Sequence, residues 1–367
     1  MTGTQRFEPG HRSSLRIGAL VPLSRPGWVA AGRHLLAGLE LGVRDVNESG
    51  GVAGRPVDLV VRDTAADPQK ASAAVEELAQ LGVAALAGEY HSVVARVVAA
   101  RAVALGVPFL CSSAVLDALT EQATDWVARL APAQSHGWRI FAHFLLGAGH
   151  RRIALATQPG VYWASGARIL REYLAPRGVT VTEFDANTLG PEAMCDALAA
   201  DRATALLLLV GHPDPAVPIV RALRRDSRLT DLLIGAPAGQ PEFADWHAEL
   251  GDDGAAIAFL RYAPESLSPL GARVDTALRE GLGEPPSFVA FEGYDTVLVL
   301  ADVLRTADAD RVRTAQSWSR VRVEGTRGQI RLSRVPGIDV WQWAWAPVMV
   351  VDRDPSEPGR IRILRGG

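Results

Sequence analysis

Cysteine is scarce in this chain of 367 residues, and neither sign of charge is in large excess. Only Cys111 and Cys195 occur, which is too few for a disulfide framework and does not form a metal-binding pattern. We therefore expect two buried thiols. The formal net charge of −3 lacks the basic excess that nucleic-acid-binding proteins show, so we predict no nucleic-acid partner.

Long apolar runs are also missing. No stretch approaches the roughly 20 apolar residues that a membrane-spanning helix needs, so we predict no direct membrane insertion. Residues 1–14 are polar and include Arg6, Glu8 and Arg12, without the apolar core of a secretory signal. We predict that residues 1–14 form a flexible segment. Two locations stay open: the cytoplasm, or export of a chain whose leader precedes this start.

The common catalytic motifs do not occur in the sequence. It has no G-x-x-x-x-G-K-[ST], no G-x-S-x-G and no H-E-x-x-H, and its eight histidines are scattered. No nucleophile–base set can be recognised, so we predict a binding protein and not an enzyme. We also predict no cofactor and no metal site.

The sequence is rich in short apolar runs that alternate with amphipathic segments. Residues 17–23 predict a strand, residues 35–46 carry apolar side chains on one helical face, and residues 57–61 alternate as a second strand. Such units build parallel sheets with right-handed crossovers. The alternation of predicted strands and helices is interrupted at residues 129–132 and then resumes. We predict an α/β fold with two doubly wound parallel-sheet lobes.

The turn between the first predicted helix and the second strand is the most specific part of the sequence. Residues 47–57 read NESGGVAGRPV, and Gly50, Gly51 and Gly54 permit a tight left-handed reversal. The phrase N-x-x-G-G-V-x-G-R-x-[VI] resembles the opening of type I periplasmic solute-binding proteins. It is most similar to the branch that binds leucine, isoleucine and valine, and to its relative, the amide receptor. The resemblance extends to about residue 335.

This resemblance implies two lobes of the periplasmic binding protein type I fold, joined by a three-strand hinge. The crossings are expected near Ala131, Tyr262 and Gly328, with Glu292 and Asp295 bordering the hinge in a structural role. The first lobe would comprise residues 15–132 and 264–328, and the second residues 133–263 and 329–367.

The implied function is a ligand-binding receptor, the substrate-binding component of an ABC transporter. Its ligand would be a small amino-acid-like molecule, amide, carboxylate or aromatic acid, and its partners the membrane subunits of the transporter. The alternative is a cytoplasmic amide-receptor-like sensor whose partner is a regulatory protein. The phrase at residues 88–92, Gly-x-Tyr-x-Ser, is closer to the amide receptor and favours this alternative.

Ligands of such folds lie beyond the carboxyl ends of the strands, in the cleft between the lobes. Ser92 opens a predicted helix, where it can cap free N–H groups and where an anion is favoured. In the resembled family this serine contacts a ligand carboxylate or amide, and the alternative is a plain helix cap. Tyr90 and His91 share its loop and are further candidates.

A second candidate loop follows the strand at residues 109–111. The family often reads S-P-S-A-T there, and the resemblance implies ligand contacts from Ser112, Ser113, Ala114 and Val115, with Val115 in the threonine position. Trp28 lies in the first loop, where the family commonly has an aromatic lid. The alternative for Trp28 is an aromatic residue packed on the surface.

The second lobe contributes Tyr162, which corresponds to the family's T-x-Y-G tyrosine, and Trp163. Either ring could close the cleft by stacking, and the alternative is a core aromatic. His212 and Pro237 follow two later strands, and Pro237 lies where amino-acid binders have an acid. A buried ammonium without a carboxylate partner is costly. From Val115 and Pro237 we predict weak binding of leucine, isoleucine and valine, and better binding of amides, carboxylates or aromatic acids.

Overall fold

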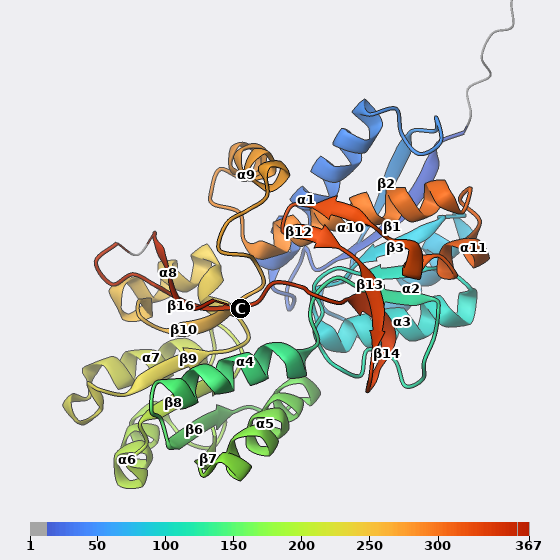
Figure 1. Cartoon of the computed structure of the whole chain (residues 1–367). Helices are drawn as coiled ribbons and strands as arrows, with labels where there is room; N and C mark the ends of the chain where they lie inside the picture. The colour runs from blue at the N-terminus through green and yellow to red at the C-terminus, as the bar shows by residue number, and fades with distance from the viewer. Residues whose placement is uncertain (1–12, 358, 367) are drawn as a thin grey trace, which may run out of the picture.

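The computed structural model describes residues 13–357 and 359–366, which form two α/β lobes (Figure 1). The first sheet has the order β13-β14-β5-β4-β3-β1-β2 and the second has the order β16-β15-β10-β9-β8-β6-β7. The strands of the first sheet are β1 (Leu15–Val21), β2 (Val57–Asp63), β3 (Ala85–Gly88), β4 (Phe109–Cys111), β5 (Val127–Arg129), β13 (Leu332–Val335) and β14 (Ile338–Trp343). Those of the second are β6 (Arg152–Thr157), β7 (Thr180–Asp185), β8 (Ala205–Leu209), β9 (Leu233–Ala236), β10 (Ala258–Arg261), β15 (Met349–Arg353) and β16 (Ile361–Arg365).

Each sheet has a parallel core and an antiparallel edge. Strands β1 to β5 pair in parallel, and so do β6 to β10, which confirms the predicted α/β fold with two sheets. Strand β13 runs antiparallel to β14, and β15 and β16 run antiparallel to their neighbours. The sheets are therefore mixed, and a short two-stranded ribbon of β11 (Val323–Gly325) and β12 (Gly328–Ile330) accompanies the first.

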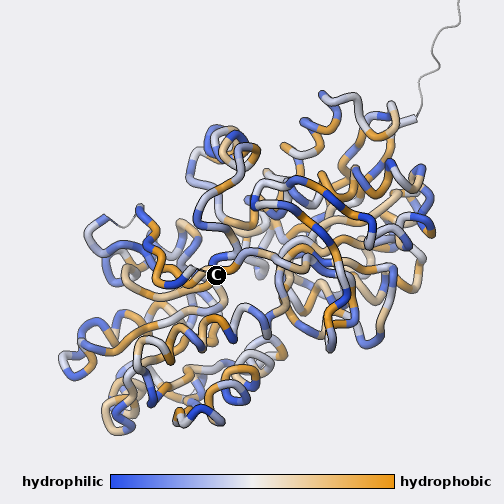
Figure 2. The backbone as a smooth tube through the Cα atoms, viewed as in Figure 1, coloured by the Kyte–Doolittle hydropathy of each residue, from blue (hydrophilic) through white to orange (hydrophobic). Residues whose placement is uncertain are grey.

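Helices cover both faces of the first sheet, as alternate side chains of β1 show. Ile17 and Ala19 belong to a core that contains Leu35 of α1, whereas Leu20 packs in a separate core with Val75 of α2. In Figure 2 the outer helices alternate blue and orange along their length, as amphipathic helices do. The helices of this lobe are α1 (Val29–Glu48), α2 (Pro68–Gln80), α3 (Ser92–Leu105), α9 (Pro269–Leu282), α10 (Phe288–Thr306) and α11 (Arg311–Ala315), and those of the second are α4 (Gln134–Gly147), α5 (Val161–Leu174), α6 (Pro191–Asp201), α7 (Ala216–Arg225) and α8 (Ala244–Leu250).

Helices α1 and α10 pack closely against each other through glycines. A Cβ atom on Gly38 would lie 1.9 Å from the Ala290 carbonyl oxygen, and one on Gly293 would lie 2.4 Å from that of Leu35. No side chain fits at either position. The amino end of α10 is also tied to the second lobe, because the Phe288 N–H donates to Glu242 Oε1 over 3.1 Å.

The chain passes between the lobes after β5, after β10, and between β14 and β15 (Figure 1). The expectation of a third crossing near Gly328, with residues 329–343 in the second lobe, is wrong. Strands β13 and β14 form a hairpin that stays with the first sheet, where Trp341 pairs with Ala128. The buried Arg129 side chain also donates to Gln342 Oε1 over 2.9 Å. The third crossing therefore lies between residues 343 and 349.

Two expectations from composition can be compared with the structure directly. Cys111 and Cys195 are free thiols and both are buried, as predicted. Over residues 13–357 and 359–366, no helix has both the length and the apolar character needed to cross a bilayer. Most of the predicted flexible N-terminal segment, residues 1–12, lies outside the described residues.

Candidate ligand-binding cleft

A cavity of about 460 Å³ lies between the two lobes, beyond the carboxyl ends of their strands. This volume is within the range of small-molecule sites. Nine of the twelve candidate residues line it, and ligand contact by them stays a prediction: Trp28, Tyr90, His91, Ser92, Ser113, Val115, Tyr162, Trp163 and His212.

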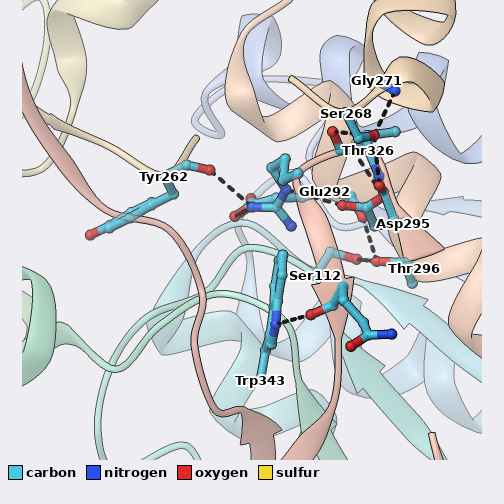
Figure 3. Close-up of polar contacts among 12 residues, drawn as sticks. Ser112, Tyr262, Ser268, Gly271, Glu292, Asp295, Thr296, Thr326 and Trp343 are labelled. Atoms are coloured by element: carbon cyan, nitrogen blue, oxygen red, sulfur yellow. Dashed lines mark hydrogen bonds and ion pairs between the residues drawn. The ribbon is translucent and has the colours of Figure 1, made fainter. Parts of the chain in front are cut away.

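The structure places the other three candidates, Ser112, Ala114 and Pro237, behind the cavity wall. Ser112 is fully buried, where its hydroxyl oxygen accepts from Thr296 Oγ1 over 2.8 Å (Figure 3) and from the Gly88 N–H over 3.2 Å. Ala114 is buried among apolar side chains, and Pro237 is buried too. In the bend that follows β4, Ser113 and Val115 line the cavity, whereas Ser112 and Ala114 do not.

Contrary to the prediction, the Ser92 side chain does not cap the start of its helix. Helix α3 begins at Ser92 itself and is preceded by His91, which makes no side-chain cap. The Ser92 hydroxyl oxygen instead accepts the N–H groups of Val115 and Leu116, each over 3.2 Å. A hydroxyl has two acceptor lone pairs and one donor hydrogen. Both lone pairs are engaged, so the Ser92 hydroxyl can offer only its hydrogen to a molecule in the cavity.

Glu89 lies beneath this loop and holds its shape. The carboxyl turns away from the cavity, accepts the Thr64 hydroxyl over 2.6 Å, and accepts the N–H groups of Tyr90 and His91 over 2.8 and 2.9 Å. Burial raises the pKa of Glu89 to about 7, against the lowering effect of these hydrogen bonds. Since Glu89 is outside the cavity lining, its side chain does not supply an ammonium partner there.

Replacing Glu89 by glutamine should change how stability depends on pH. Because the pKa of Glu89 rises from 4.5 to about 7 on folding, the folded state binds more protons than the unfolded state between these values. Glu89 therefore lowers the free energy of unfolding as pH rises from 5 to 8, by up to about 3 kcal/mol. In the Glu89→Gln variant, this part of the fall in the free energy of unfolding should be absent. Urea denaturation at pH 5 and at pH 8 measures the difference.

The exposed Glu48 supplies the control for this pH dependence. Glu48→Gln should follow the wild type at both pH values. A Glu89→Gln variant that loses as much stability as the wild type between pH 5 and 8 would show that Glu89 titrates as an ordinary carboxyl.

Trp28 joins the two lobes across the cleft. Its backbone N–H donates to His91 Nε2 over 3.0 Å, which fixes the loop in the first lobe. Its indole N–H donates to Asp245 Oδ2 of α8 over 2.9 Å, and its ring stacks on His212 with centroids 5.7 Å apart. The Phe243 ring lies 4.6 Å from the Trp28 ring. Trp28 thus has the contacts of a residue that holds the lobes together.

The second-lobe wall contains two acids that the sequence reasoning did not select. Asp245 and Glu249 line the cavity, as does Gln240, which follows the end of β9. Tyr262 and Phe288 line it where the second lobe meets α10 of the first. The two acids lie on helix α8, several residues beyond the end of β9, so a search at strand ends does not find them. The second lobe does carry acids, which removes the premise of the predicted weak binding of amino acids.

A buried ionic cluster lies at the crossing between the lobes (Figure 3). Arg327 pairs with Glu292 over 3.2 Å and with Asp295 over 3.1 Å, and it donates to the Tyr262 carbonyl oxygen over 3.0 Å. Asp295 also accepts the N–H and hydroxyl of Thr326 over 2.7 and 2.9 Å. These contacts tie α10 to the turn between β11 and β12 and to the connecting segment that follows β10.

A two-lobed α/β fold with a cavity of this size between the lobes suits a protein that encloses a small molecule. A family model described as periplasmic binding protein matches residues 14–336, and the chain belongs to this family. The Leu/Ile/Val-binding protein BraC3 of Rhizobium johnstonii is 23% identical over 317 residues, which cover 84% of this chain and 85% of that protein. The family match confirms the predicted resemblance to type I periplasmic solute-binding proteins. It also confirms the prediction of a binding protein and not an enzyme.

Solved structures agree with this fold. The leucine binding protein LivK of Thermotoga maritima superposes with a TM-score of 0.82 at 20% identity, covering 95% of this chain and 97% of LivK. A solute-binding protein of R. palustris, solved in complex with benzoate, superposes with a TM-score of 0.78 at 17% identity and covers 96% of each chain.

Proposed function

We propose that this protein is the substrate-binding component of an ABC transporter and carries a small molecule with a carboxylate or carbonyl group on an apolar body. The Ser92 hydroxyl is the observation that carries the proposal. Its lone pairs are occupied by the N–H groups of Val115 and Leu116, so it favours a ligand that presents an acceptor oxygen.

The apolar body of such a ligand would pack among aromatic rings. Trp28 and Tyr90 line the cavity from the first lobe, and Tyr162 and Trp163 from the second. Aromatic side chains provide large apolar contact areas and offset or edge-on packing for another ring. Two similar proteins are associated with carboxylates of this general kind. LivK is described as a leucine binding protein, and the R. palustris protein was solved in complex with benzoate.

Binding would favour the closed arrangement because the ligand touches both lobes only there. A ligand shifts such an equilibrium by its difference in affinity for the open and closed states. The membrane subunits of the transporter would then recognise the closed form.

A thermal-shift screen of aliphatic acids, aromatic acids, amides and amino acids, followed by native mass spectrometry, tests the ligand class. Failure of every acid and amide to raise the melting temperature would contradict the proposal.

Ser92→Ala should weaken binding of the strongest compound in that screen. Loss of one hydrogen bond reduces the binding free energy by about 1 kcal/mol, or by up to about 3 kcal/mol where it serves a carboxylate. The variant should also unfold more easily, because the N–H groups of Val115 and Leu116 lose their acceptor. Calorimetry measures the affinity and urea denaturation the stability.

Ser317→Ala controls for the loss of a buried hydroxyl outside the cavity. The Ser317 hydroxyl donates to the Arg313 carbonyl oxygen over 2.6 Å, and its removal should lower stability without changing affinity. Equal ligand affinity of Ser92→Ala and wild type would place Ser92 outside the binding site.

A further inference from the structure

The second-lobe wall of the cavity contains three buried polar atoms that have no hydrogen-bond partner within residues 13–357 and 359–366. They are Gln240 Oε1, His212 Nε2 and Asp245 Oδ1, and all three residues line the cavity. Leaving a buried polar group unpaired costs about 1–3 kcal/mol. Three such atoms on one wall therefore indicate groups that a bound molecule satisfies.

The orientation of the Gln240 amide is fixed by its own backbone contact. Gln240 is 2% exposed, and its Nε2 donates to the Val210 carbonyl oxygen over 3.0 Å. Only the nitrogen of an amide can face a carbonyl oxygen, so the Val210 contact determines which end is Oε1. Oε1 is left as a buried acceptor, and it requires an N–H or O–H donor.

His212 and Asp245 are acceptors for similar reasons. The His212 ring is held between Trp28 and Trp246, with centroids 5.7 and 5.4 Å away, and its Nδ1 lies 3.8 Å from Asp245 Oδ2. Burial lowers the pKa of His212, against the nearby carboxylates of Asp245 and Glu249, which favours the neutral ring. The tautomer that carries its proton on Nδ1, on the side of the Asp245 carboxylate, leaves Nε2 as an acceptor. Asp245 Oδ2 is taken by the Trp28 indole, which leaves Oδ1.

We propose that this wall selects ligands that offer it an N–H or O–H donor, in addition to the acceptor oxygen offered to Ser92, and that Gln240 is the specificity-determining residue. The inference rests on the proposed function and deepens it. The cavity is polarised, with the hydroxyl hydrogen of Ser92 on the first lobe and acceptor atoms on the second. A hydroxyl, an amide N–H and an ammonium share the chemistry that this wall recognises.

Two pairs of matched compounds test the donor requirement. Benzoate and 4-hydroxybenzoate differ by one hydroxyl, and 4-methylpentanoate and leucine differ by the amino group. Calorimetry with the wild-type protein should show the donor-bearing member binding at least about tenfold more tightly in one of the pairs. The pair that shows the difference identifies the donor as a hydroxyl or an ammonium. Equal affinities within both pairs would overturn the inference.

Gln240→Met tests the residue, because methionine keeps the length of the side chain and removes the acceptor. It should bring the affinity ratio of the responding pair close to one, with less than about threefold change for the donor-free member. Gln342→Met is the matched control: Gln342 is buried and its Oε1 accepts from Arg129 over 2.9 Å, but Gln342 does not line the cavity. This control should keep the wild-type ratio.

The outcomes separate the inference from the proposed function. An unchanged ratio in folded Gln240→Met would overturn the role of Gln240. If Gln240→Met does not fold, the wild-type ratios alone decide the donor requirement. Failure of every acid and amide in the thermal-shift screen, these four included, would instead contradict the proposed function, and the inference would fall with it.

Discussion

Replacing Arg327 by methionine should lower the free energy of unfolding by about 3–5 kcal/mol, which is the largest effect on stability that we expect. The side chains of Arg327, Glu292 and Asp295 are all fully buried. Without the guanidinium, two carboxyls lose their counter-charge in an environment with little water, and the Tyr262 carbonyl loses a donor. Urea denaturation at pH 7 measures the change.

Two further variants separate this cluster from ordinary ion pairs. Arg279→Met breaks an exposed pair with Asp275 on helix α9 and should cost less than about 1 kcal/mol. Arg327→Met combined with Glu292→Gln and Asp295→Asn should recover part of the lost stability, because no charge then remains buried. A loss below about 1 kcal/mol for Arg327→Met alone would show that the cluster does not hold the crossing together.

Replacing Trp28 by alanine should weaken ligand binding about 100-fold, the largest effect on affinity that we expect. Truncation of a central aromatic at an interface costs about 2–4 kcal/mol. Trp28 supplies the hydrogen bond to Asp245 and the ring contacts with His212 and Phe243, so its loss removes contacts made between the lobes. Calorimetry with the strongest compound of the thermal-shift screen measures the change.

Trp28→Phe and Trp345→Ala provide the comparison. Phenylalanine keeps an aromatic ring but has no N–H for Asp245, so its affinity should fall by a smaller factor, about tenfold. Trp345 is 85% exposed and lies outside the cavity lining, and its removal should leave the affinity unchanged. Wild-type affinity in Trp28→Ala would show that Trp28 packs on the surface and plays no part in closure.

The α/β rhythm could be predicted from the sequence because it is local. Steps of four, four and three place Leu35, Leu39, Val43 and Val46 on one face of α1, and the alternation at residues 57–61 predicts β2. The third crossing could not be found in this way. Its position depends on the pairing of β14 with β5, strands about 200 residues apart, and no local pattern encodes that choice.

The candidate site was predictable where family phrases occur at strand ends, and less so elsewhere. The loops that carry Ser92, Ser113 and Val115 do meet at the cavity. The partners of the Ser92 hydroxyl, however, come from a loop 23 and 24 residues further on. Asp245 was missed because helix α8 is set beside the cavity by packing of the folded lobe and not by a strand end.

Closure of the two lobes over a bound molecule is tested most directly by small-angle X-ray scattering. The radius of gyration should decrease when the wild-type protein is saturated with the strongest compound of the screen, and calorimetry on the same sample confirms saturation. Trp28→Ala, saturated in the same way, should compact less. A radius of gyration that stays the same with and without saturating ligand would contradict a hinged receptor that closes on its ligand.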